Sequence, residues 1–272
     1  MLLGVYQSAP VFGDAEGNIE GLAKVLKGSE AQLLVLPELF NTGYQFVSRE
    51  EVATLAEEIP EGRTCRALMD LALTHKVVLV FGLAERDGRR FYNSAAVVGP
   101  GGYIGTYRKV HLFADEKDVF DPGDTGFKVF NLEKARIGVM ICFDWLFPES
   151  ARVLSLLGAD ILCHPANLVL PHCQKAMVTR SLENGVFSAT ANRIGTEKRG
   201  GRLPLVFTGH SQIVHSSGKI LASLDGKETG VAVVDIVPDQ ARHKKITSKN
   251  DRLGDRRPEM YEILLNPNRT PA

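Results

Sequence analysis

The segment from residue 135 to residue 145 has the sequence Ala135-Arg136-Ile137-Gly138-Val139-Met140-Ile141-Cys142-Phe143-Asp144-Trp145. Its apolar first part, rich in β-branched residues, predicts a buried strand that ends in a single cysteine. Pro148-Glu149-Ser150 follows closely and indicates a helix with proline in its first turn. Open α/β sheets carry their chemistry at the carboxyl ends of strands, so Cys142 is a candidate nucleophile. The alternative is an inert core residue, because free cysteines are often buried.

The rest of the chain predicts an α/β protein in which one order of elements occurs twice. In the first half we expect strands at 2–8, 32–36 and 77–84, helices at 15–26, 49–58 and 64–75, and a hairpin across 91–108. From residue 135 the second half repeats a strand, a helix, an apolar strand with proline (162–165), a helix (172–184), a strand (186–191) and a hairpin (211–224). We expect residues 231–236 to close the second half. Neither half could cover both faces of its sheet alone, so we predict two sheets packed together with helices outside.

The composition indicates a globular protein and disfavours several classes of partner. Apolar residues make up 44% of the 272 residues, and 32 basic residues balance 32 acidic ones. Because phosphate binding needs a positive excess, we expect no nucleic-acid partner. The four cysteines match no zinc pattern, and no apolar run approaches the ~18 residues of a membrane helix. With no charged signal-peptide head before the first strand, we expect a cytoplasmic protein with reduced thiols and no membrane partner.

Three predicted strand ends carry reactive groups, which are Glu38, Lys109 and Cys142. A lone buried charge is costly, so an acid and an ammonium at one edge of the sheets are expected to pair. Together with a thiol they suit acyl transfer. A carboxylate can take the thiol proton, while the ammonium and the backbone N–H of Phe143 can stabilise the negative charge of a tetrahedral intermediate.

Three motifs, in this order and spacing, resemble the signatures of the nitrilase superfamily, the carbon–nitrogen hydrolases. They are Leu36-Pro37-Glu38-Leu39-Phe40, Tyr107-Arg108-Lys109-Val110-His111-Leu112-Phe113 and Ile141-Cys142-Phe143-Asp144-Trp145-Leu146-Phe147-Pro148-Glu149. The resemblance covers nearly the whole chain and implies an α/β fold, a four-layer αββα sandwich that forms a homodimer or a higher homo-oligomer. We expect one hydrolase domain over residues 1–272, with the polar residues 238–272 as a tail on its surface or at a dimer interface.

The resemblance also implies a Glu-Lys-Cys triad, which corresponds here to Glu38, Lys109 and Cys142. A further family glutamate matches Glu116, although the charged run around it is by itself typical of a solvated loop. In the implied reaction, Glu38 takes the thiol proton as Cys142 attacks an amide or nitrile carbon, and water then releases the acid. No metal and no organic cofactor is needed for this reaction.

The choice between amide and nitrile stays open at the level of the sequence. Phe143-Asp144 after the cysteine resembles amidase branches, yet the motif as a whole also resembles short archaeal-type members described as aliphatic nitrilases. We therefore expect a small aliphatic amide or nitrile as substrate. Arg193 and Arg202 lie in loops that could bind a charged substrate. Candidate pocket residues, with ordinary packing as the alternative, are Tyr44, Phe143, Trp145 and Asn167.

Two alternative functions remain open. A Cys-His hydrolase would use His111, His164 or His172 as the base. The alternative that is not an enzyme is a catalytically silent binding module with the same fold. A metal site made of His111, Asp115 and Glu116 is less consistent with the sequence, because the spacing matches no helical pair of ligands.

Overall fold

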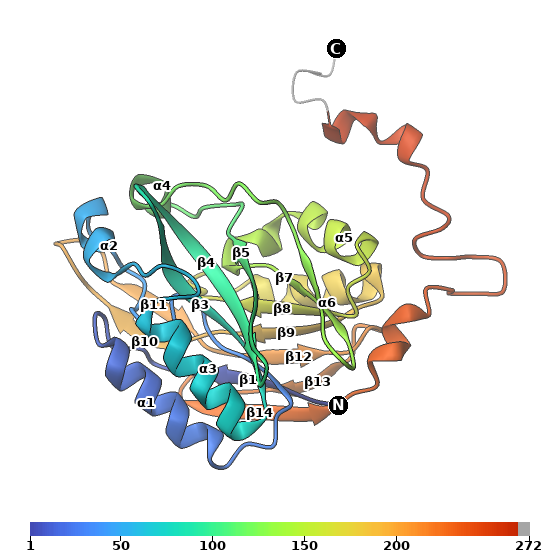
Figure 1. Cartoon of the computed structure of the whole chain (residues 1–272). Helices are drawn as coiled ribbons and strands as arrows, with labels where there is room; N and C mark the ends of the chain where they lie inside the picture. Colours follow the sequence, from blue (N-terminus) through green and yellow to red (C-terminus); the bar gives the residue numbers. More distant parts are fainter. Residues whose placement is uncertain (266–272) are drawn as a thin grey trace.

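Two six-stranded sheets form the centre of the protein, as the computed structural model in Figure 1 shows. The structure describes residues 1–265. In spatial order, the first sheet contains β14 (Gly230–Asp235), β1 (Leu2–Gln7), β2 (Leu33–Val35), β3 (Val78–Asp87), β4 (Arg90–Gly99) and β5 (Gly102–Arg108). The second contains β13 (Ile220–Ser223), β12 (Gln212–Val214), β9 (Phe187–Ala191), β8 (Ile161–Pro165), β7 (Arg136–Val139) and β6 (Val129–Asn131). A separate two-stranded sheet pairs β10 (Ile194–Glu197) with β11 (Leu205–Thr208).

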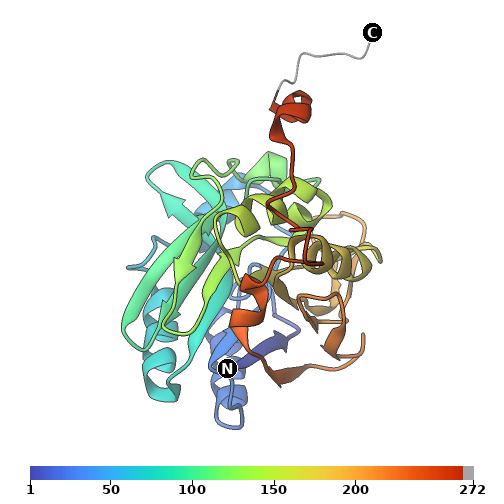
Figure 2. The same cartoon turned by 90° about the vertical axis from the view of Figure 1, so that its right-hand side faces the viewer.

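Helices cover the outer faces of the two sheets, which completes the predicted four-layer αββα sandwich (Figures 1 and 2). The first sheet carries α1 (Ala15–Leu26) and α3 (Arg63–His75), and the second carries α5 (Pro148–Leu156) and α6 (Cys173–Asn184). Shorter segments are α2 (Arg49–Leu55), α4 (Glu116–Val119) and the 3₁₀ turns η1 (Cys142–Leu146), η2 (Pro238–Arg242), η3 (Pro258–Met260) and η4 (Glu262–Leu265). The fully buried side chains of Val5, Val35 and Ile161 belong to the hydrophobic core that joins the two sheets.

The two halves of the chain have the same strand topology. In each half, three strands run parallel, the next two are antiparallel, and one further strand pairs antiparallel with the first. The prediction that residues 231–236 close the second half is wrong, because β14 crosses over and pairs with β1 along its whole length. This pairing covers an edge of the first sheet that would otherwise expose unpaired backbone groups. In the second sheet β6, which was not predicted, occupies the matching edge.

The strand that leads to Lys109 ends at Arg108 as predicted, but the strand that leads to Cys142 ends earlier than expected. Ladder pairing of β7 stops at Val139, and Cys142 lies at the start of η1 with a φ of +38°. This left-handed backbone conformation is costly for a residue with a side chain, and it cannot continue a strand. The prediction that the buried strand runs up to Cys142 is therefore wrong by three residues. The turn directs the cysteine out of the sheet at its carboxyl edge.

After η2 the chain passes the C-terminal end of α6, where Lys244 Nζ donates to the backbone carbonyls of Asn184 and Gly185. Its described end then lies far from both sheets (Figure 1). Apolar side chains at this end are exposed, including Ile263 and Leu264. The last part of the predicted tail, 266–272, lies outside the described residues. Within residues 1–265, no helix is both long enough and apolar enough to cross a membrane.

Candidate active site

Lys109 lies at the centre of a buried cluster of charges. Its Nζ is 2.6 Å from Oε1 of Glu38 and 2.7 Å from both carboxylate oxygens of Glu116. Lys109 and Glu38 are fully buried, and Glu116 is nearly so. Burial opposes the charged form of the lysine, but Glu116 and Glu38 outweigh it, so the pKa of Lys109 lies above its ordinary value. The ammonium is therefore a fixed positive charge at neutral pH.

The two carboxylate oxygens of Glu38 have different surroundings. Oε1 accepts hydrogen bonds from Lys109 and from Asn93 Nδ2, the latter at 2.8 Å. Oε2 is buried and has no hydrogen-bond partner among the described residues. Burial raises the pKa of Glu38 to about 7, although Lys109 acts in the opposite direction. A carboxylate with this pKa and one unoccupied oxygen is suited to accept a proton near neutral pH.

The neighbouring turn places Cys142 beside this cluster. Burial, reinforced by the charge of Glu38, raises the pKa of the Cys142 thiol well above its ordinary value. At neutral pH the resting side chain is therefore a thiol, which needs a base before it can attack. Asp144 holds the turn, since its carboxylate accepts hydrogen bonds from the Ile141 N–H at 2.8 Å and from the Tyr107 hydroxyl at 2.7 Å.

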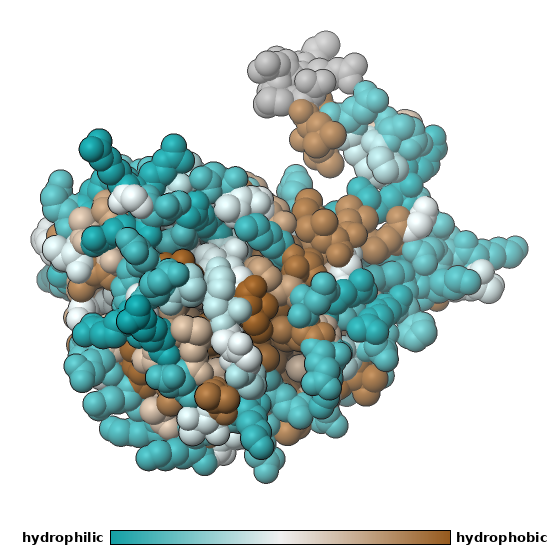
Figure 3. Space-filling view, in the orientation of Figure 1, coloured by the Kyte–Doolittle hydropathy of each residue, from teal (hydrophilic) through white to brown (hydrophobic). Residues whose placement is uncertain are grey.

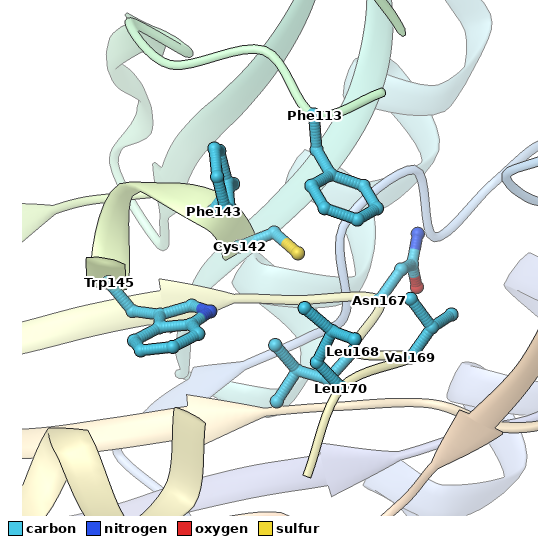
Figure 4. A pocket seen from close by; sticks show the side chains of 8 residues that line it. All are labelled: Phe113, Cys142, Phe143, Trp145, Asn167, Leu168, Val169 and Leu170. Carbon is cyan, nitrogen blue, oxygen red and sulfur yellow. The ribbon is translucent and has the colours of Figure 1, made fainter. Parts of the chain in front are cut away.

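The sulfur of Cys142 opens into a small pocket, shown in Figure 4. Its volume is about 10 Å³, which is room for roughly one water molecule. Three of the four predicted pocket residues line it, and the fourth, Tyr44, lies on a neighbouring cavity. The lining residues are Phe113, Cys142, Phe143, Trp145, Asn167, Leu168, Val169 and Leu170. The Asn167 amide also donates a hydrogen bond of 2.8 Å to the backbone carbonyl of Glu38.

Tyr44 contacts the charge cluster directly. Its hydroxyl donates a 2.6 Å hydrogen bond to Oε1 of Glu116, and the backbone N–H of Phe113 donates to Oε2 at 3.2 Å. The segment around Tyr44 is fixed in turn by Glu197, whose carboxylate accepts from the backbone N–H groups of Tyr44 and Gln45. A chain of hydrogen bonds thus runs from Glu197 through Tyr44 to Glu116 and Lys109.

Several supporting residues were not predicted from the sequence. Asn93 interrupts a strand of otherwise mostly apolar residues, and this single buried amide was a usable signal. The role of Glu197 gave no local signal, because the backbone N–H groups that it holds, those of Tyr44 and Gln45, lie 153 and 152 residues earlier in the chain. Long-range pairs of this kind become visible only once β10 and β11 are placed.

The candidate histidines of a Cys-His mechanism are engaged elsewhere. His164 Nε2 is 2.9 Å from the backbone carbonyl oxygen of Cys142, not from its sulfur, and burial lowers the pKa of His164 to about 4. His111 Nδ1 is 2.8 Å from Asp144, and its ring stacks on Phe147. His172 is exposed just before α6. The geometry therefore favours Glu38 over a histidine as the base.

The residues considered for metal or charged-substrate binding have other partners. His111 pairs with Asp144, Asp115 with Arg202, and Glu116 with Lys109. Within residues 1–265, no cluster of three or more His, Cys, Asp or Glu side chains is arranged to hold a metal ion. Arg193 is buried and paired with Glu197.

Comparison with known proteins places this site in a family. Residues 2–245 match the carbon–nitrogen hydrolase family. The chain belongs to this family of hydrolases. A nitrilase of Pyrococcus abyssi (strain GE5 / Orsay) is 52% identical over 244 residues, which cover 89% of this chain and 90% of that protein. The resemblance seen in the sequence and the expectation of an enzyme of the nitrilase superfamily are thus confirmed.

Solved structures of carbon–nitrogen hydrolases share the fold. A carbon–nitrogen hydrolase of Helicobacter pylori G27 superposes with a TM-score of 0.87 at 27% identity, covering 98% of both chains. A mutant amidase of Nesterenkonia sp. AN1 superposes with a TM-score of 0.79 at 27% identity, covering 97% of this chain and 96% of that one. In that amidase, the active-site cysteine carries the acetamide moiety of fluoroacetamide.

Proposed function

We propose that this carbon–nitrogen hydrolase converts a small aliphatic amide or nitrile to the carboxylic acid and ammonia through a covalent intermediate on Cys142. The observation that carries the proposal is the buried Glu38–Lys109–Glu116 cluster beside the Cys142 thiol, in which Oε2 of Glu38 accepts no hydrogen bond from the described residues. The pocket volume of about 10 Å³ favours a small group at the reacting carbon.

In the acylation step, Glu38 accepts the thiol proton through its unoccupied oxygen as Cys142 sulfur attacks the substrate carbon. Negative charge then develops on the carbonyl oxygen, or on nitrogen in a nitrile. Lys109 and the backbone N–H of Phe143, at the start of η1, stabilise this charge. For an amide, the proton held by Glu38 passes to the leaving nitrogen, the carbon–nitrogen bond breaks, and ammonia departs. A nitrile gives a thioimidate first, and water converts it to the same thioester with loss of ammonia.

In the second step, a water molecule attacks the thioester carbon. Glu38, now without its proton, accepts one from the water, and the carbon–sulfur bond breaks to release the carboxylic acid and the thiol. Glu116 holds Lys109 in place through both of its oxygens and thereby helps to position the charge that stabilises the intermediate. One water is consumed for each amide and two for each nitrile.

A catalytically silent binding module is the second candidate function. It is disfavoured because every position of the proposed triad carries a reactive group in hydrogen-bonding or electrostatic contact with the next. The Cys-His alternative is disfavoured by the hydrogen bond of His164 to a backbone carbonyl.

The test combines ammonia release with mass spectrometry of the intact protein. Amides and nitriles of matched carbon skeleton are assayed, and the mass of a trapped acyl or thioimidate adduct is located on the chain. We expect the adduct on Cys142, and we expect Cys142→Ala to lower kcat on the order of 10⁶-fold, the loss seen when a serine protease loses its nucleophile. Cys163→Ala is the matched control, because Cys163 is equally buried but lies within β8. The absence of both ammonia and an adduct with every compound of the panel would indicate a binding module.

We further propose a cytoplasmic homodimer built from one domain, with the described part of the tail, residues 238–265, at the subunit interface. Three residues of α5 and its C-terminal end, Val153, Leu156 and Leu157, are exposed, whereas Leu154 is fully buried. Figure 3 shows hydrophobic residues gathered on the surface over α5. A second copy of the chain would remove this surface from water. Sedimentation of the purified protein measures the mass, and a monomer with a folded active site would contradict the proposal.

A further inference from the structure

A second, larger cavity lies next to the Cys142 pocket. Its volume is about 540 Å³, and the two spaces share Phe113 in their walls. Glu116 and Tyr44, which hold the charge cluster, also line the larger cavity. The smaller pocket has room for about one water molecule, so the part of a substrate beyond its reacting group needs further space. The larger cavity is the adjoining space that can take it.

Each charged side chain that lines this cavity has a partner of opposite charge. Its lining includes three charged side chains, Asp115, Glu116 and Arg202. Glu116 is paired with Lys109, which it shares with Glu38, and Asp115 lies 2.8 Å from Arg202. Arg202 also donates to the backbone carbonyls of Phe46 and Val47, at 3.0 and 3.2 Å.

The remaining wall is largely apolar. Phe46, Phe120, Leu203 and Leu205 contribute to it, together with Phe113. A charged group that entered would lose water without gaining a free counterion, because each charge already has a partner. A cavity of this kind selects uncharged ligands partly because binding a charged ligand is unfavourable, and not only because it makes good contacts with the uncharged one.

We propose that this cavity binds the part of the substrate remote from the scissile bond as an uncharged, apolar group, and that the Asp115–Arg202 pair excludes ammonium and carboxylate groups from it. The inference rests on the proposed function and narrows its substrate class to neutral amides or nitriles with an apolar chain. Asp115 and Arg202 act here as specificity-determining residues.

The test uses probes that differ only in charge at the far end. Hexanamide is compared with 5-aminopentanamide, in which an ammonium replaces the terminal methyl, and 5-methylhexanamide is compared with glutaramate, which carries a carboxylate. We expect kcat/KM to fall about 10- to 100-fold for each charged probe, as for a buried polar group without a partner. Equal turnover of the charged and neutral probes would overturn the proposal.

Two reciprocal variants show whether the ion pair sets this preference. Arg202→Met leaves Asp115 without a partner, so the ratio of kcat/KM for 5-aminopentanamide over hexanamide should rise about tenfold. Asp115→Asn frees Arg202, so the ratio for glutaramate over 5-methylhexanamide should rise by a similar factor. If either variant raised or lowered kcat/KM for both charged probes together, relative to their neutral counterparts, the Asp115–Arg202 pair would not set the charge preference.

Binding measurements separate this proposal from the proposed chemistry. Calorimetric titration of Cys142→Ala with hexanamide and 5-aminopentanamide reports the preference of the cavity without turnover. Tighter binding of hexanamide supports a cavity that prefers uncharged groups, whether or not the intact protein cleaves amides. Failure of the intact protein to cleave any amide would count only against the proposed hydrolysis. Equal binding of the two probes would overturn the neutral cavity whatever the protein cleaves.

Discussion

The two halves of the chain share a strand order but bring different chemistry to the site. The first half supplies the charged side chains, which are Glu38, Lys109 and Glu116. The second half supplies groups that are uncharged at neutral pH, which are Cys142, His164 and Asn167. Even the matching strands differ at their ends, because the proline at the end of β8 is followed by Ala166, whereas Pro37 after β2 is followed by an acid.

This asymmetry shows that a repeated backbone does not fix where charge is placed. Both carboxylates that contact Lys109 lie in the first half. The buried carboxylates of the second half, Asp144 and Glu197, bind other groups, and Asn167 donates only to the backbone of Glu38. Burial, with a smaller contribution from the charge of Glu116, raises the pKa of Glu38 to about 7 although Lys109 acts in the opposite direction. The thiol proton therefore passes, in the proposed reaction, from the neutral half to the charged half.

The largest expected effect in the charged half comes from Glu38→Gln. The amide cannot accept the thiol proton, so kcat/KM for ammonia release should fall about 10²–10⁴-fold. In the unaltered protein, kcat/KM should decrease as pH falls below about 7, because Glu38 becomes protonated and can no longer act as a base. This decrease should be absent from the residual activity of the variant. The full pH–rate profile of both proteins is the measurement.

Glu85→Gln is the matched control for that experiment. Glu85 is also a buried carboxylate of the first sheet, but it pairs with Arg108. We expect this variant to keep the decrease of activity below pH 7. If the two variants had the same pH profile, the base would have to be sought elsewhere.

A second prediction concerns the stability of the charged half. Lys109→Met leaves Glu38 and Glu116 buried without their cation, and breaking a buried pair in this way costs about 3–5 kcal/mol of unfolding free energy. Adding Glu116→Gln removes one of the two orphaned charges and should restore part of the loss. Guanidinium unfolding followed by circular dichroism measures the difference. If the double variant recovered no unfolding free energy, repulsion between the two carboxylates would not be the main cause of the destabilisation.

Much of this organisation could be predicted from the sequence, because it depends on local patterns. The apolar strands and their order gave the two sheets, and three short motifs identified Glu38, Lys109 and Cys142 as residues that meet. The crossing of β14 to the first sheet could not be predicted, since nothing local distinguishes the edges of the two sheets. The left-handed conformation of Cys142 was equally hidden, because it depends on Asp144 and on packing around η1.

The third prediction addresses the neutral half through His164. Its ring bonds the backbone carbonyl of the strained Cys142 and Thr190 Oγ1, and the lowered pKa keeps it uncharged above about pH 4. His164→Asn should lower the unfolding free energy by about 1–3 kcal/mol, as for a buried hydrogen bond that is lost. The decrease of kcat/KM below pH 7 should stay as it is. Loss of that decrease in His164→Asn, but not in Glu38→Gln, would favour a Cys-His mechanism.

The smallest predicted effect lies at the border between the halves, where Glu197 of the second half fixes the segment around Tyr44 of the first. Glu197→Gln keeps an oxygen acceptor but removes the charge that strengthens the bonds to the Tyr44 and Gln45 N–H groups. A weakening of about 1 kcal/mol corresponds to a loss in kcat/KM of roughly fivefold. Kinetics of ammonia release at saturating and limiting substrate separate the loss into kcat and KM.

A double-variant cycle tests whether this effect passes through Tyr44. Glu197 is expected to act by holding the Tyr44 hydroxyl on Glu116. If so, Glu197→Gln should cause almost no further loss of kcat/KM in a protein that already carries Tyr44→Phe. Glu51→Gln is the matched control, since Glu51, like Glu197, pairs with an arginine, here Arg199 of the β10–β11 connection, but accepts a hydrogen bond from the Val47 N–H instead. Its loss should simply add to that of Tyr44→Phe. Additive losses for Glu197→Gln would mean that the second half supports this segment generally and does not reach the charge cluster through the tyrosine.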